Sequence, residues 1–147
     1  MGRKRYHKAT RLLITADCGG SNGARVRLWK VELQKFADQT GLAITVAHHP
    51  PGTSKWNRIE HRMFAFVSQN WRGKPLFSHQ VIVQLIAATK TAAGLIVFSA
   101  IDAAHYPKGD KITNAQLKAV NIRYDAFHPD WNYSILPSKP SPHRRSK

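Results

Sequence analysis

The segment between residues 11 and 48 constrains the fold more than any other part of the chain. It begins with a nearly continuous apolar run at residues 11–16, which is typical of a strand covered on both faces. A glycine-rich loop follows, in which Ser21 or Asn22 is expected to cap the next helix. A second run of the same kind at residues 42–47 predicts another strand. Strand, helix and strand in this order predict an α/β fold whose two parallel strands are joined by a right-handed crossover.

The rest of the chain is predicted to be mainly helical. The helix inside the first segment is amphipathic, and Gly41 is expected to end it. Further elements are predicted from capping residues and apolar spacing: a helix at residues 54–70, a helix capped by Ser78, a strand at 95–99, and a helix at 114–120 behind a Thr113 and Gln116 capping box.

The charge of the chain favours a polyanionic partner. Lysine and arginine total 23 against 8 acidic residues, which gives a formal net charge of +15. Such an excess attracts nucleic acid. The alternative, that the charge only keeps the fold soluble or lies in disordered ends, stays open, because part of the excess falls in residues 2–5 and 143–147.

Length, cysteine use and apolar runs limit the class of protein. A chain of 147 residues fits one domain of ordinary size. The single cysteine, Cys18, excludes an internal disulfide and predicts a reducing, cytoplasmic compartment. No apolar run approaches the roughly 18 residues that a membrane span requires, so we expect no membrane partner.

Two acidic residues differ from the others in their surroundings. Asp17 follows the first predicted strand directly, where open α/β sheets place their ligand crevices. Glu60 falls inside the apolar stripe of the helix at 54–70, where a carboxylate needs a partner. Asp17 as an ordinary turn residue and Glu60 as the partner of an arginine, or as a side chain reaching the edge of the stripe, remain alternatives.

A pair of carboxylates on facing elements suits a hard divalent cation. Mg²⁺ or Mn²⁺ prefers oxygen ligands, and Mg²⁺ commonly uses one or two protein carboxylates together with water and substrate phosphates. Two such ions activate a water or a 3′-hydroxyl for attack on a phosphodiester. Asp17 and Glu60 are therefore candidates for metal ligands and catalytic residues. Because His48, His49 and His61 show no zinc spacing, they are expected to be polar loop residues or DNA contacts.

Two stretches of the chain resemble the second and third acidic motifs of bacterial insertion-sequence DDE transposases. They are Thr15-Ala16-Asp17-Cys18-Gly19-Gly20-Ser21-Asn22 and His49-Pro50-Pro51-Gly52-Thr53-Ser54-Lys55-Trp56-Asn57-Arg58-Ile59-Glu60-His61. Residues 69–76 and 131–133 also look similar to this group. From about Arg3 to Leu136 the chain resembles the Rhodopirellula-type DDE transposase family.

The resemblance implies a fold, an activity and a set of site residues. The fold would be RNase H-like, with a short parallel strand-helix-strand core and flanking helices. The activity would be metal-dependent phosphodiester cleavage and strand transfer, with Mg²⁺ or Mn²⁺ as cofactor and transposon ends and target DNA as partners. Asp17 and Glu60 would hold the metal, Asn57 would shape the glutamate loop, and these residues would contact DNA: Lys55, Asn57, Arg58 and Arg62.

The chain departs from this family in one respect. The family carries its first catalytic aspartate on an N-terminal strand, and residues 1–16 contain no acidic residue. We therefore expect a C-terminal part of the catalytic domain at residues 11–136, between a basic leader at 1–10 and a disordered basic tail at 137–147. Such a part is expected to have little activity alone and, with an apolar sheet edge and face exposed, to self-associate.

Two other functions remain open. A non-catalytic nucleic-acid-binding protein would use the basic faces and the tryptophans for binding, and its affinity would not depend on Asp17 or Glu60. An RNase H-like nuclease would share the acidic residues and the metal but would release cleaved strands.

Overall fold

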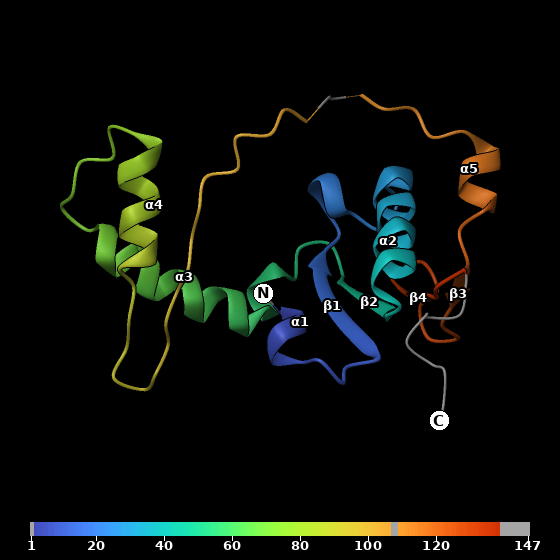
Figure 1. Cartoon of the computed structure of the whole chain (residues 1–147), viewed down its shortest axis with the longest axis horizontal. Coiled ribbons are helices and arrows are strands. Elements are labelled where there is room, and N and C mark those ends of the chain that lie inside the picture. The colour runs from blue at the N-terminus through green and yellow to red at the C-terminus, as the bar shows by residue number, and fades with distance from the viewer. Residues whose placement is uncertain (1, 107–108, 139–147) are drawn as a thin grey trace. The chain divides into compact units, whose positions relative to one another are not determined.

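The computed structural model describes residues 2–106 and 109–138 (Figure 1). The predicted basic tail therefore lies, from residue 139 on, outside the described residues. The described residues fall into two compact units, one within Met1–Trp56 and Gly109–Lys147 and one within Asn57–Lys108. The first unit contains helices and strands together, whereas the second consists of helices and extended segments.

The first unit is built on a four-stranded mixed sheet with the strand order β1-β2-β4-β3. Its elements, in chain order, are α1 (Gly2–Arg5), β1 (Arg11–Asp17), η1 (Gly20–Asn22), α2 (Arg27–Thr40), β2 (Ala43–His49), η2 (Ser54–Trp56), α5 (Asn114–Lys118), β3 (Ile122–Tyr124) and β4 (Asn132–Ile135). β1 and β2 are parallel, with α2 between them in the chain. The predicted parallel strand-helix-strand core is thus confirmed.

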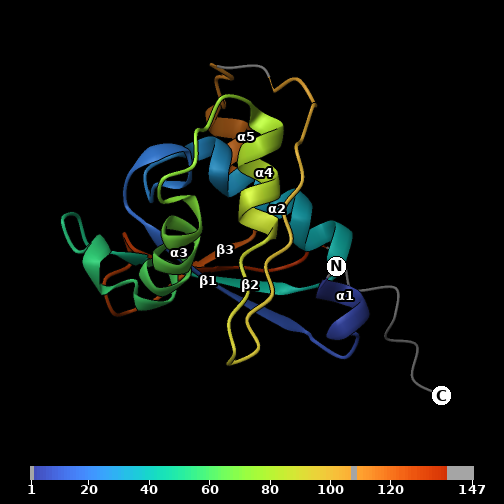
Figure 2. The same cartoon turned by 90° about the vertical axis from the view of Figure 1, so that its left-hand side faces the viewer.

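Side chains along the strands point alternately to the two faces of the sheet, and the core lies between one of these faces and α2. Ile44 and Val46 of β2 and Ile135 of β4 are fully buried, while Thr45 between the first two is exposed. From α2, Leu33 and Ala37 join this cluster, and Figures 1 and 2 show α2 lying against one face of the sheet. The period of two along β2 therefore separates a buried face from an exposed one.

α2 ends as predicted but begins differently. Gly41 has the left-handed conformation (φ 72°), and its N–H donates to the carbonyl of Ala37 at 2.8 Å. The prediction that Ser21 or Asn22 caps this helix is wrong, because those residues belong to η1 and the cap position is Val26, which makes no side-chain cap.

A buried glutamine joins α2 to the C-terminal strands. The Gln34 amide nitrogen donates to the carbonyl of Leu136 at 3.0 Å, and its oxygen accepts the Asn121 N–H at 2.7 Å. A buried amide is stable only when its donors and acceptor are satisfied. Gln34 therefore fixes where β3 begins and where β4 ends relative to the helix.

The second unit contains α3 (Arg58–Trp71) and α4 (His79–Ala87). Val67 is its buried apolar residue in α3, and the Asn70 side chain donates to the carbonyl of Leu85 in α4. Ser78 caps α4 as predicted, since its Oγ accepts the Val81 N–H at 3.2 Å.

Two predictions for the chain beyond β2 need correction, and one is confirmed. The strand predicted at 95–99 is absent; one bridge, between Lys90 and Ile96, forms instead, so this apolar run has no partner strand with which to form a ladder. The helix predicted from residue 54 begins at Arg58, after η2. The Thr113 and Gln116 capping box at α5 is confirmed, with the Gln116 N–H donating to Thr113 Oγ1 at 3.2 Å.

Among the described residues, no helix has both the length and the apolar character that crossing a bilayer demands.

Candidate functional site

Asp17 is the last residue of β1 and lies at a hollow in the first unit. The hollow has a volume of about 320 Å³ and lies where the parallel strands β1 and β2 end. It is lined by Asp17, Cys18, Gly19, Pro50, Pro51 and Gly52. Two loops that follow neighbouring parallel strands thus form a crevice at the carboxyl edge of the sheet, the usual place for a ligand in such folds.

Both loops of this Asp17 hollow are held by close contacts. A Cβ on Gly23 would lie 2.7 Å from the carbonyl oxygen of Cys18, so a side chain at this position would force the first loop to move. In the second loop, Thr53 Oγ1 donates to the carbonyl of Pro50 at 2.6 Å. The glycine and the threonine therefore shape the hollow without taking part in its lining.

The Asp17 carboxylate is suited to a cation. Its Oδ1 is buried and has no hydrogen-bond partner in the part of the chain that the structure describes. A buried carboxylate oxygen without a donor is costly unless a cation or a proton satisfies it. Burial, and then the Asp17 charge, raise the pKa of the neighbouring Cys18 thiol, so this thiol does not offer a thiolate ligand to a cation. The residues at this position therefore fit a hard divalent cation.

A buried histidine holds the backbone of Asp17. His48 Nδ1 lies 3.1 Å from the Asp17 carbonyl oxygen, and His48 Nε2 lies 3.2 Å from the Tyr133 hydroxyl. A carbonyl can only accept, so Nδ1 carries the proton; Nε2 of the neutral ring then accepts from Tyr133. Burial lowers the pKa of His48 and raises the pKa of Tyr133 to about 12, so a neutral ring and an intact phenol agree with this assignment.

His48 corrects the prediction made for it. It lies within β2 and is 5% exposed, so it is neither a loop residue nor a DNA contact. The sequence offered one signal that could have revealed its burial: His48 follows Ile44 and Val46 at the same period of two.

Replacing Tyr133 by phenylalanine is expected to lower the free energy of unfolding by about 1–3 kcal/mol, because the buried His48 Nε2 loses its donor. Tyr124→Phe is the matched control. Lys30 Nζ lies 5.2 Å from the ring centre of Tyr133 and 5.7 Å from that of Tyr124, and both substitutions keep these interactions. Tyr124 is 55% exposed, so its change should cost less than about 0.5 kcal/mol. Urea denaturation measures both changes. Equal losses in the free energy of unfolding for the two variants would contradict a stabilising hydrogen bond between Tyr133 and His48.

The buried His48 also predicts a pH dependence of stability. Because the pKa of His48 is lowered in the folded state, the unfolded chain takes up a proton first as the pH falls below about 6.5. The free energy of unfolding should therefore fall below that pH, by at most about 1.4 kcal/mol per pH unit, until the folded-state pKa is passed. Urea denaturation between pH 5 and 7 measures this slope. His48→Gln should flatten it, and an unchanged slope would rule out this origin.

Glu60 lies in the second unit, in the first turn of α3, and is exposed. Its Oε2 accepts a hydrogen bond of 2.7 Å from the Asn57 side-chain amide. The prediction that Glu60 is enclosed in an apolar stripe is wrong, since Ile59 and Phe64 beside it are exposed as well. A carboxylate in the first helical turn is instead stabilised by the helix dipole, and Asn57 fixes its direction.

The basic residues predicted to contact DNA are accessible. Lys55 of η2 and Arg58 and Arg62 of α3 are all exposed, and Asn57 is half-buried and holds Glu60. Contact with DNA stays a prediction for all four. No three His, Cys, Asp or Glu side chains gather into a metal-binding group within the residues that the structure describes.

The comparisons with known proteins identify a family for this chain. The family described as the Rhodopirellula transposase DDE domain matches residues 1–137. No curated protein and no solved structure matches the chain significantly. The family match covers both acidic motifs and the C-terminal strands β3 and β4, so it spans the whole sheet described above.

Proposed function

Because the chain belongs to the Rhodopirellula transposase DDE domain family, we propose that it provides two metal ligands, Asp17 and Glu60, to an RNase H-like transposase site that cuts and joins DNA. The observation that carries this proposal is the buried Asp17 Oδ1, which lacks a partner among the described residues at the carboxyl edge of a parallel strand pair. The proposal requires that Glu60, from the other compact unit, reaches the same metal ions.

The residues of the chain have distinct parts in this proposal. When bound, divalent ions supply activation of a water or 3′-hydroxyl and stabilise the leaving oxygen in an in-line displacement. Asp17 and Glu60 hold the ions through their carboxylates. Asn57 orients Glu60 through the 2.7 Å hydrogen bond.

The loop and helix around Glu60 would hold the DNA. Lys55, Arg58 and Arg62 are exposed within one short stretch of chain that also carries Glu60. Their positive charges neutralise backbone phosphates, which positions a strand without reading its sequence.

Metal binding by the chain tests the proposal without requiring turnover. Titrating the chain with Mn²⁺ should broaden the amide resonances of residues 17–19 and of Gly52, and those near Glu60, in the same concentration range. Asp17→Asn should abolish the effect at the first set, and Asp110→Asn, which removes an exposed carboxylate elsewhere, should preserve it. Unchanged broadening in Asp17→Asn would refute the metal site, and broadening that never reaches Glu60 would refute the shared site.

A further inference from the structure

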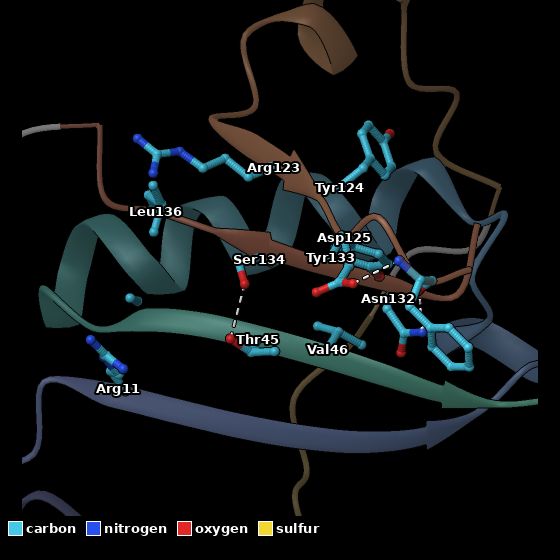
Figure 3. Close-up of a pocket in the computed structure, with 12 residues that line it drawn as sticks. Arg11, Thr45, Val46, Arg123, Tyr124, Asp125, Asn132, Tyr133, Ser134 and Leu136 are labelled. Carbon is cyan, nitrogen blue, oxygen red and sulfur yellow. Dashed lines mark hydrogen bonds between the residues drawn. The ribbon is translucent and has the colours of Figure 1, made fainter. Parts of the chain in front are cut away.

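The sheet of the first unit has a second, larger hollow on the face opposite the core. It has a volume of about 620 Å³, and Figure 3 shows the residues around it. The strand register explains its shape. The middle strands present small side chains to this face, Ala43 and Thr45 from β2 and Ser134 from β4. The longer side chains stand at the outer strands, so the centre of the sheet is a trough.

The floor of this sheet hollow is polar. Thr45 Oγ1 and Ser134 Oγ, which face each other across β2 and β4, lie 2.9 Å apart and share a hydrogen bond (Figure 3). Leu13 of β1 is the one large apolar side chain that the register places in this row, and it is 64% exposed. The row therefore has a polar centre, while Leu13 and the rings of Tyr124 and Phe127 leave apolar surface exposed around it.

Two arginines stand at one end of the sheet hollow. Arg11 comes from β1 and Arg123 from β3, the two outer strands, and Figure 3 shows them at the same end, on either side of Leu136. Three strand spacings of about 4.8 Å put the outer strands roughly 14 Å apart. Both arginines are exposed, and neither has an ion pair or hydrogen bond with a described residue. Two unpaired guanidinium groups over a polar floor favour an anionic ligand.

An exposed aromatic ring on a fixed backbone, Phe127, also lines the hollow, hydrogen-bonded to Asn132, which Figure 3 shows at the end away from the two arginines. Phe127 is 71% exposed, yet its N–H donates to Asp125 Oδ1 at 2.8 Å and its carbonyl accepts from the Asn132 side chain at 2.9 Å. Its ring also lies edge-on to His128, which stacks on Trp131. Hydrogen bonds thus fix the Phe127 backbone through both its N–H and its carbonyl, while the ring stays exposed to solvent. Such a ring is suited to stack on the face of another ring.

We propose that the sheet hollow binds a single strand of nucleic acid, with Arg11 and Arg123 on two of its backbone phosphates and Phe127 stacked on a base. Phosphates at the end with Arg11 and Arg123 and a base beside Phe127 match the charges and the ring at those places, while the Asp125 carboxylate in the lining accepts the Phe127 N–H. An unpaired base is required, because a duplex hides the base faces. This surface is separate from the predicted DNA contacts around Glu60, and its occupation requires neither Asp17 nor Glu60.

Fluorescence anisotropy with a labelled oligothymidylate and a labelled duplex, both in EDTA, tests this proposal. The double variant Arg11→Gln and Arg123→Gln should weaken binding of the single strand by at least about 10-fold and lower its salt slope by about 1.4, the value for two phosphates at 0.7 each. The matched control is Lys111→Gln with Lys118→Gln, which removes two exposed charges of the same unit outside the hollow. It should change the affinity less than about 3-fold.

The ring is tested by a separate pair of variants. Phe127→Leu should weaken binding of the single strand by at least about 5-fold, the lower end of the effect of removing a base stack, and leave binding of the duplex unchanged. Phe77→Leu, at a ring that is 78% exposed in the other unit, is its control.

Three results would overturn the proposal: equal losses in the arginine and lysine double variants, equal losses for single strand and duplex, or competition by polyglutamate as strong as by oligothymidylate. Asp17→Asn should bind the strand normally in EDTA, so failure of the metal site is distinguishable from failure of the hollow. The positions substituted in the hollow and its controls are exposed, and unchanged far-UV circular dichroism verifies the fold.

Discussion

Binding of the chain to duplex DNA is expected to weaken by about 1,000-fold or more when the salt concentration rises from 50 to 200 mM. This is the loss expected when six or more phosphates are neutralised, and the chain carries 23 lysines and arginines against 8 acidic residues. Of the lysines and arginines that the structure describes, Lys35 alone forms an ion pair, with Glu32 at 2.6 Å. Among the described residues, no acidic side chain therefore competes with DNA for the other lysines and arginines.

Salt titrations by anisotropy also show which charges contribute. Replacing Lys55, Arg58 and Arg62 by alanine should lower the slope of log K against log salt by about 2.7, at 0.9 for each phosphate that is no longer neutralised. The control variant replaces Lys90, Lys111 and Lys118, which are exposed as well, and should lower it by less than about one unit. A slope that does not change when the three charges near Glu60 are removed would exclude these residues from the DNA interface, whatever the total affinity.

The sequence predicted those parts of the fold that depend on neighbours in the chain. The parallel strand-helix-strand core, the end of α2 at Gly41 and the caps at Ser78 and Thr113 all follow from residues within one element or its ends. The hairpin of β3 and β4 was missed because its strands have three and four residues, too few to show a period. Its place in the sheet comes from pairing with β2 across more than 80 residues.

The candidate site also contains features that the sequence predicted and features that it did not. The position of Asp17 at the end of a strand was predictable from a local pattern, and the structure adds the buried oxygen and the hollow beside it. The support from His48 and Tyr133 was not predictable, because it joins side chains 85 residues apart in the chain. For Glu60 the helical period suggested burial, but an apolar stripe is buried only where another element covers it, and here Ile59 is 82% exposed.

Asp17→Asn and Glu60→Gln should each reduce Mg²⁺-dependent DNA nicking by more than about 100-fold. Even outer partners of metal ligands are worth about 10- to 100-fold in affinity or activity, and these two substitutions remove the charges of the proposed ligands themselves. The double variant should be little worse than either single one, because groups that act as one unit are not additive. Nicking of supercoiled DNA is measured with the chain alone and with the chain joined to the sequence encoded directly upstream of it.

Matched variants separate loss of chemistry from loss of structure or binding. Glu32→Gln removes an exposed helical carboxylate paired with Lys35 and should retain nicking. DNA binding in EDTA should be unchanged in Asp17→Asn and Glu60→Gln, because neither carboxylate attracts phosphate. Asn57→Ala should give an intermediate loss, since Glu60 keeps its charge but loses the hydrogen bond that orients it. Full nicking by Glu60→Gln would exclude its role as a ligand, and weaker DNA binding by that variant would point instead to a structural part for the first turn of α3.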